Sequence, residues 1–174
     1  MYSEPLPKIS LLRLLAVVVG FGVVIWWAIG ASGHGDPFWF WTRFDETPTA
    51  ITLYYRGQVV EFGPGQKGFA ELAQAFNQSF SRRNGWSTLG VSPESAADYR
   101  QREVALAVRY SRKVNIHTQY RFGPYAGLFL PLTGRHSETH PVWGLDGDDL
   151  AAGAVHLDTV EPVVRVLREL GYAL

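Results

Sequence analysis

The first thirty residues contain one uninterrupted apolar run that differs from every later stretch of the chain. Residues Ile9 to Ile29 read ISLLRLLAVVVGFGVVIWWAI, with Arg13 as the single charge. In a helix, a run of this length extends about 31 Å, which matches the hydrocarbon thickness of a bilayer. We therefore predict a transmembrane anchor over residues 9–30, preceded by a short tail at residues 1–8.

The charges that flank the run predict its orientation. Arg13 lies one turn inside the run, so its long side chain can reach the near interface. Lys8 and Arg13 precede the apolar centre, whereas Asp36 is the only charge between it and Arg43. The positive-inside rule therefore predicts a single-pass protein of the cell membrane, with a cytoplasmic N-terminus and an extracytoplasmic C-terminal domain. A cleaved signal peptide is the alternative, but its apolar core is usually only about 7–15 residues long.

Aromatic residues gather where the run ends and just beyond it. Residues 38–41 read FWFW. Indole rings favour the membrane-water boundary, so we predict that residues 31–48 form an aromatic juxtamembrane linker. The alternative is that the FWFW segment packs into the folded domain as ordinary core. The residues predicted at the membrane interface are Arg13, Trp26, Trp27, Trp39 and Trp41.

The pattern changes to strands and amphipathic helices over residues 49–174. Two β-rich runs around Gly57 predict a hairpin. Phenylalanine, leucine and alanine then recur at spacings of three and four, which predicts a helix from about Gln66 to Arg83, ended by Asn84 and Gly85. Ser92 and Pro93 begin a short second helix that ends near Arg102.

The remaining segments alternate with a period of two until the last helix. Residues 103–120 form either one long bent strand or two strands broken at residues 111–113. Further strands are expected at 125–132, 141–143 and 153–157, and a helix at 160–170. This order predicts an α+β domain, with one antiparallel sheet and helices packed on one face.

Composition removes several classes of function. The chain has no cysteine, which excludes disulfides, thiolate nucleophiles and cysteine-ligated metals. Residues 51–135 contain eleven Lys and Arg against five Asp and Glu, and residues 136–174 contain two against seven. This asymmetry has two interpretations. The basic half forms a face that binds anionic headgroups or an acidic partner, or the opposite charges meet across the fold. Nucleic acid is not an expected partner, because no basic run exceeds two residues.

One short segment carries chemically suggestive side chains. His136, Glu138 and His140 occupy alternate positions, so an extended backbone would point all three to one side as ligands for a divalent metal. The alternative is a solvated surface loop. The chain lacks a phosphate-binding loop and a nucleophile elbow, and no cofactor is expected.

These patterns favour binding over catalysis. We expect a non-enzymatic accessory subunit or interaction module that is held at the lipid bilayer and binds a protein partner in the membrane or envelope. Two alternatives remain open. One is a metal-assisted envelope hydrolase that uses His136, Glu138 and His140, and the other is a sensory module with a small-ligand pocket around Tyr120, Tyr125 and Trp143.

Overall fold

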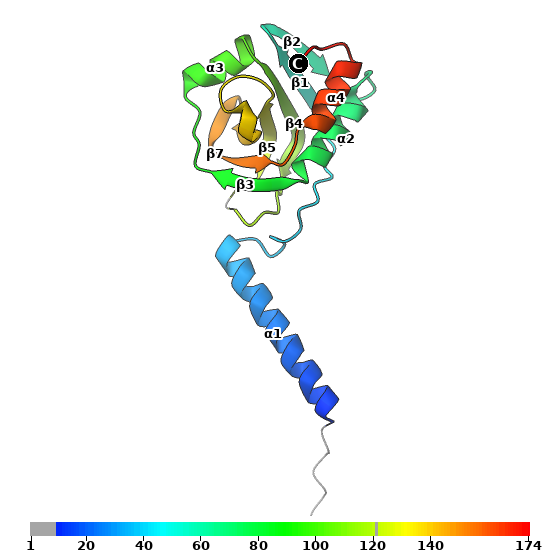
Figure 1. Ribbon diagram of the computed structural model, residues 1–174, viewed down its shortest axis with the longest axis vertical. Helices are drawn as coiled ribbons and strands as arrows, with labels where there is room; N and C mark the ends of the chain where they lie inside the picture. The colour runs from blue at the N-terminus through cyan, green and yellow to red at the C-terminus, as the bar shows by residue number, and fades with distance from the viewer. Residues whose placement is uncertain (1–9, 121) are drawn as a thin grey trace, which may run out of the picture.

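A single helix, α1 (Leu11–His34), projects from the base of a sheet domain in the computed structural model, which describes residues 10–120 and 122–174 (Figure 1). The predicted tail at residues 1–8 lies outside the described residues. None of the 24 residues of α1 is buried, and the helix is long and apolar enough to cross a membrane. It ends at Gly35, whose φ of 71° stops the helix in the left-handed conformation. The helix thus runs to His34 instead of residue 30.

The domain is built on one seven-stranded sheet in which every neighbouring pair is antiparallel. Its spatial order is β2-β1-β4-β5-β6-β7-β3, so β2 and β3 form the two edges. The strands are β1 (Ala50–Tyr55), β2 (Gln58–Phe62), β3 (Arg83–Ser87), β4 (Val104–Val114), β5 (Tyr125–Pro131), β6 (Pro141–Asp146) and β7 (Asp149–Leu157).

Two helices cover one face of the sheet, α2 (Phe69–Phe80) and α4 (Glu161–Glu169). Their apolar stripes bury Leu72, Phe76 and Leu167 against alternate residues of the strands, in the larger of two core clusters. Burying a large apolar side chain contributes about 1.5–3 kcal/mol relative to exposure, so this face supplies most of the hydrophobic stabilisation. The α+β prediction with a single antiparallel sheet is confirmed.

The opposite face carries a smaller core under α3 (Pro93–Gln101). Tyr99 of this helix packs against Phe129 and Trp143, which lie on the strands between residues of the larger cluster. Trp143 is fully buried, and its indole nitrogen donates to the carbonyl of Leu89. The sequence analysis placed all helices on one face, whereas α3 lies on the other.

The element boundaries differ from the prediction mainly at β3. The helix predicted to reach Arg83 ends at Phe80, and the residues that were expected to stop it form an edge strand along β7. The two-residue hairpin turn at Arg56 and Gly57 is confirmed, with φ of 48° and 87°. Residues 104–114 form one long strand whose register shifts between Arg109 and Val114.

Candidate functional site

We refer to residues 35–46, the larger part of the segment between α1 and the first strand, as the junction. Its first residues form a tight turn. The Asp36 carboxylate accepts a hydrogen bond of 2.8 Å from the Phe38 backbone N–H, and the Trp41 N–H donates to the Phe38 carbonyl at 2.7 Å. An aspartate that caps its own turn in this way reverses the chain direction. The residues after the turn therefore fold back toward α1.

The reversed segment packs on the last turns of α1. The Trp39 ring lies against Gly30, where an added Cβ would come within 2.5 Å of the indole nitrogen. Trp39 also meets the Trp26 ring edge-on, with centroids 5.5 Å apart, and lies 4.9 Å from the His34 ring. The Trp27 indole donates to the Pro37 carbonyl at 2.9 Å. The junction is thus fixed to the helix.

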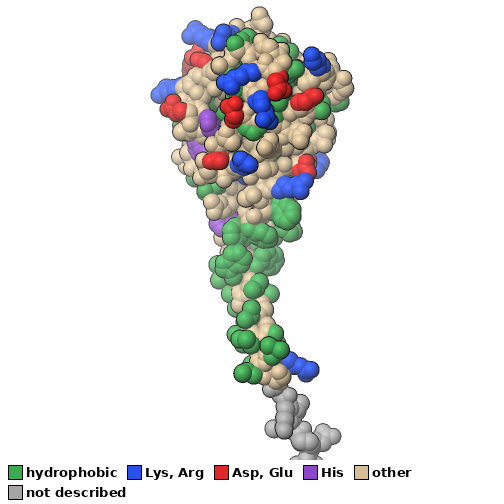
Figure 2. Space-filling view, turned by 45° about the vertical axis from the view of Figure 1, so that its right-hand side comes forward, with side chains coloured by type: hydrophobic (Ala, Val, Ile, Leu, Met, Phe, Trp, Pro, Cys, Tyr) green, Lys and Arg blue, Asp and Glu red, His purple; other side chains and the backbone are tan. Residues whose placement is uncertain are grey.

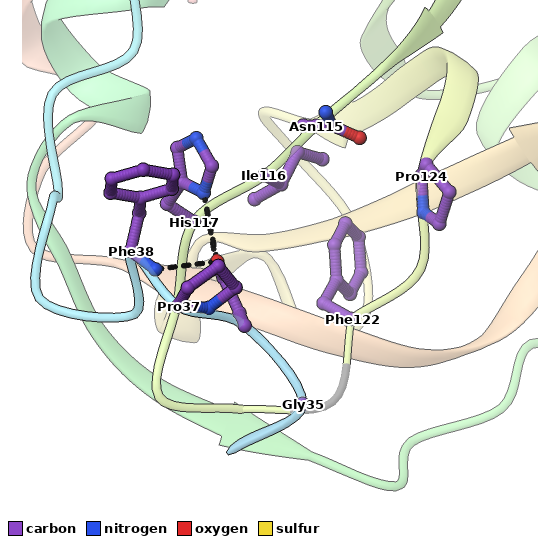
Figure 3. Close-up of a pocket in the computed structure, with 9 residues that line it drawn as sticks. Gly35, Pro37, Phe38, Asn115, Ile116, His117, Phe122 and Pro124 are labelled. Atoms are coloured by element: carbon purple, nitrogen blue, oxygen red, sulfur yellow. Dashed lines mark hydrogen bonds and ion pairs between the residues drawn. The ribbon is translucent and has the colours of Figure 1, made fainter. Parts of the chain in front are cut away.

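The same turn also contacts the domain, at the far end of β4. His117 Nδ1 lies 3.0 Å from the Asp36 carboxylate, and its ring meets the Phe38 ring edge-on at 5.5 Å. Figure 3 shows Phe38 and His117 side by side, across an open cleft from Phe122 and Pro124. The cleft has a volume of about 490 Å³ and combines one carboxylate and one imidazole with apolar walls.

Arg83 fixes the middle of the junction. At the start of β3, its guanidinium donates to three backbone carbonyls: Phe80 at 2.6 Å, Thr42 at 2.9 Å and His117 at 2.8 Å. These carbonyls belong to α2, the junction and the loop after β4. Burial lowers the pKa of Arg83 to about 10, which still leaves it cationic at neutral pH. Arg83 therefore joins three segments through one charged group.

The end of the junction enters the core. The Phe44 side chain is only 5% exposed and packs edge-on against Phe80, with ring centroids 4.7 Å apart. Its backbone N–H donates to the Ser81 hydroxyl at 2.8 Å. Two residues later, the Glu46 carbonyl accepts from Asn77 of α2 at 2.8 Å. The junction therefore continues without interruption from α1 into the hydrophobic core.

The base of the molecule is apolar, and the rest of its surface is mixed in charge. In the face seen in Figure 2, hydrophobic side chains gather along α1 and where it meets the domain, whereas cationic and anionic side chains alternate above them. Phe38, Phe40 and Trp41 of the junction are 54%, 49% and 55% exposed. Contiguous exposed aromatic groups of this kind mark a surface that a membrane or partner covers.

The predicted interface residues fall at both ends of α1. Trp26, Trp27 and Trp39 come together at its C-terminal end, and Trp41 follows on the junction, where its N–H donates to the Phe38 carbonyl. Arg13 lies in the first turn of the helix, at the other end. Residues 38–41 lie largely outside the core, unlike the alternative that the FWFW segment packs into the folded domain, whereas Phe44, three residues further on, is buried.

The proposed metal ligands do not converge. His136, Glu138 and His140 lie around a 3₁₀ turn (Ser137–Thr139), and both histidines have left-handed backbone, with φ of 68° and 47°. The extended backbone that would align the three side chains is therefore absent. His140 Nδ1 instead lies 2.9 Å from the Ser137 carbonyl. Among the described residues, no group of three or more His, Cys, Asp and Glu side chains is arranged to hold a metal ion.

The aromatic residues proposed for a ligand pocket are also separated. Trp143 belongs to the core beneath α3, whereas Tyr125 packs on the other face against Phe122. Tyr120 stacks on Trp86 of the edge strand β3.

The unequal charge of the two chain halves is partly neutralised across the sheet. Arg109 of the basic half forms a 2.5 Å ion pair with Asp148 of the acidic half, in the β6–β7 turn. Arg100 donates to the Asp148 carbonyl. These contacts favour the second alternative for the charge asymmetry, in which opposite charges meet across the fold.

Arg83, Asp36 and His117 are the site residues that the sequence analysis missed. Arg83 was assigned to a helix end, and His117 to a strand. Apart from the nearby Phe80 and Phe38, their partners lie 34 to 81 positions away in the sequence, so no local spacing reveals them. The available signal was compositional: an isolated aspartate and a dense aromatic run directly after the anchor.

Comparisons with protein-family models, with curated proteins and with solved structures found no match. Functional conclusions therefore depend on the geometry of the junction.

Proposed function

We propose that this protein is a single-pass membrane protein. Its junction holds the sheet domain at a fixed height and orientation on the extracytoplasmic face of the membrane. There the domain serves as an accessory subunit that binds another envelope protein. α1 is the anchor in this proposal. Lys8 and Arg13 favour a cytoplasmic N-terminus, and Trp26, Trp27 and Trp39 suit the opposite interface.

The observation that carries the proposal is the unbroken series of contacts from α1 to the core. A domain that only needed tethering would be served by a flexible polar linker, which orders nothing and costs little. Here the linker is aromatic and bonded on both sides: Trp39 contacts Gly30, Asp36 contacts His117, and Arg83 contacts Thr42. Ordering these residues costs conformational entropy, which the contacts must offset. Such geometry fits a domain whose orientation matters to a partner.

The test compares partner capture by two insertion variants of the full-length protein. Inserting Gly-Ser-Gly-Ser between Gly35 and Asp36 keeps the anchor and the domain but separates the two. The matched control carries the same insertion between Arg56 and Gly57, in the exposed hairpin turn. Loop extension costs only a few tenths of a kcal/mol to about 1 kcal/mol, so both variants are expected to fold.

The measurement is quantitative mass spectrometry after crosslinking in the native membrane, detergent extraction and affinity capture. We expect one reproducible partner that is retained by wild type and by the hairpin variant, and is reduced at least several-fold in the junction variant. Equal capture by both variants would show that fixed orientation is dispensable. If no specific partner is captured, the accessory-subunit proposal fails. The mass of the mature N-terminus, measured in the same sample, separates an anchor from a cleaved signal peptide.

A further inference from the structure

A second aromatic pair lies beside the end of α1, outside the junction. Tyr120, in the loop after β4, stacks on Trp86 of β3, with ring centroids 6.4 Å apart and planes inclined by 12°. Tyr120 lines a shallow cavity together with His34, the last residue of α1, and with Gly35 and Asp36 of the junction. In Figure 1, β3 lies at the base of the domain, on the side from which α1 projects.

Trp86 is unusual in its exposure. Among the described residues beyond the junction, it and Val59 are the only large hydrophobic side chains that are strongly exposed, at 39% and 60%. Val59 lies on the edge strand β2, at the end of the domain farthest from α1 (Figure 1). Trp86 therefore marks an apolar position at the base that the fold itself leaves uncovered.

The length of α1 sets the depth of this pair. If the hydrocarbon begins near Arg13, about 20 residues carry the helix across it and place the outer boundary near Gly33. His34 is then about 1.5 Å further along the helix axis, at the inner edge of a headgroup layer about 5–8 Å thick. Tyr120 lines the same cavity as His34, so it lies close to this layer.

The chemistry of this region suits the headgroup layer. Tryptophan and tyrosine concentrate there because each has an apolar ring and a polar group that stays hydrated. The described loop residues, 115–120 and 122–124, contain no carboxylate that anionic lipids would repel, and the one carboxylate that lines the cavity, Asp36, is paired with His117. The cavity that Tyr120 lines shares Ile116 and Phe122 with the neighbouring cleft, which is lined by the exposed Phe38 of the junction.

We infer that Trp86 and Tyr120 form a second membrane contact, in which the base of the domain rests in the headgroup layer of the leaflet that α1 enters. The inference depends on one part of the proposed function, that α1 spans the bilayer. With two separate contacts, at the junction and at β3, the domain cannot rotate freely about the helix axis. The membrane itself thus helps to set the orientation that the junction transmits.

The test measures depth at single cysteines, since the native chain contains none. Spin labels are placed at Gln119→Cys, an exposed neighbour of Tyr120 that leaves both rings intact, and at Val59→Cys as the distal reference. A third label at Trp41→Cys reports the junction. The full-length protein is reconstituted in nanodiscs of phosphatidylcholine and phosphatidylglycerol, and label accessibility to oxygen is compared with accessibility to a water-soluble nickel complex.

We expect the oxygen-to-nickel ratio at position 119 to exceed that at position 59 several-fold and to approach the ratio at position 41. Adding Trp86→Ser and Tyr120→Ser in the Gln119→Cys protein should lower the ratio toward the distal value, and unchanged near-UV circular dichroism confirms that the domain stays folded. Equal ratios at positions 119 and 59 would overturn the inference. If position 41 gives a membrane value in that case, the anchor stands and only the second contact fails. If position 41 is also aqueous, the junction lies above the membrane surface and neither contact exists, whether or not α1 spans the bilayer.

Discussion

The junction with its partner His117, and the segment from His136 to His140, both combine imidazole, carboxylate and other polar groups, but they differ in what those groups contact. Junction residues bond to partners far along the chain: Glu46 to Asn77, 31 positions away, and Asp36 to His117, 81 positions away. In the second segment, His140 and Thr139 bond to residues three positions away. The first region joins distant parts of the fold, and the second mainly shapes its own turn.

This difference separates the chemistry of a side chain from its placement. His136, Glu138 and His140 are metal-ligand types at suggestive spacing, yet the 3₁₀ turn directs them apart. Asp36 and His117 share no motif, yet the fold brings them within 3.0 Å. Four predictions test whether the junction is the constrained region and the loop is not.

The largest effect is expected at Arg83. Arg83→Met keeps the aliphatic stem but removes the donors to three carbonyls, and hydrogen bonds from charged donors contribute roughly 1.5–3 kcal/mol each before non-additivity. We expect the free energy of unfolding to fall by about 3 kcal/mol. Denaturant unfolding of the full-length protein in detergent, followed by near-UV circular dichroism, measures this change.

The neighbouring arginine supplies the control. Arg82 is exposed, so Arg82→Met should change the free energy of unfolding by less than about 0.5 kcal/mol. Similar losses in the two variants would mean that charge or helix-end effects, not the bonds from Arg83, stabilise this corner of the domain.

The contact between α1 and the junction is tested at glycine. In Gly30→Ala the new methyl group would lie 2.5 Å from the Trp39 indole nitrogen, so the ring must move, at a cost of about 1.5 kcal/mol. A loosened junction should be cut by trypsin after Arg43 about tenfold faster in nanodiscs. Gly33→Ala is the matched control, because nothing lies within 4 Å of its added Cβ. Equal cleavage rates would show that Trp39 does not hold the junction on the helix.

A smaller effect is expected at His117, with His140 as the control. His117→Ala removes the contact with Asp36 and the edge of the Phe38 ring, which should increase tryptic cleavage after Arg43 about fivefold, equivalent to about 1 kcal/mol. His140→Ala removes only a local bond and should leave that cleavage rate unchanged. Adding Asp36→Asn to His117→Ala should increase the cleavage rate little further, since both changes disrupt the same contact. Full additivity would mean that the two residues act separately.

Periodicity was sufficient to predict most of the fold. The hairpin turn, the phenylalanine stripe of α2 and the Ser92–Pro93 start of α3 follow from local rules, and each lies where those rules place it. β3 was missed because Asn84 and Gly85 resemble a helix stop, and only pairing with β7 makes them a strand. α3 was assigned to the wrong face because its single buried residue, Tyr99, gives no stripe that indicates a side.

The site was less predictable than the fold. The aromatic residues predicted a juxtamembrane linker over residues 31–48, and Trp39 of this segment lies against α1. They did not predict that Phe44 is buried in the core, because buried and exposed aromatic residues look alike in sequence. Among the described residues, Arg83 donates to backbone carbonyls and to no carboxylate. Every residue has a backbone carbonyl, so these partners leave no signature in the sequence.

The smallest effect is expected under the junction, at Tyr110 of β4. Its ring lies beneath Phe44, and its buried hydroxyl has no hydrogen-bond partner among the described residues. Because an unpaired buried hydroxyl costs stability, Tyr110→Phe should raise the free energy of unfolding at neutral pH by up to about 1 kcal/mol. Burial, and secondarily the Glu46 carboxylate, raise the pKa of Tyr110 above its ordinary value of 10.0. The folded protein therefore keeps this proton at alkaline pH, where the unfolded chain releases it.

The raised pKa of Tyr110 makes the stability of the protein depend on pH. The wild-type protein should lose stability relative to Tyr110→Phe as pH rises above about 10, and the difference should be constant below that pH. Arg83 is common to both proteins, so its own titration cancels in the comparison. Denaturant midpoints measured between about pH 7 and 11, with phenolate absorbance recorded in parallel, give the result. A difference that does not grow at alkaline pH would show that water reaches Tyr110 and that the junction does not seal the core beneath it.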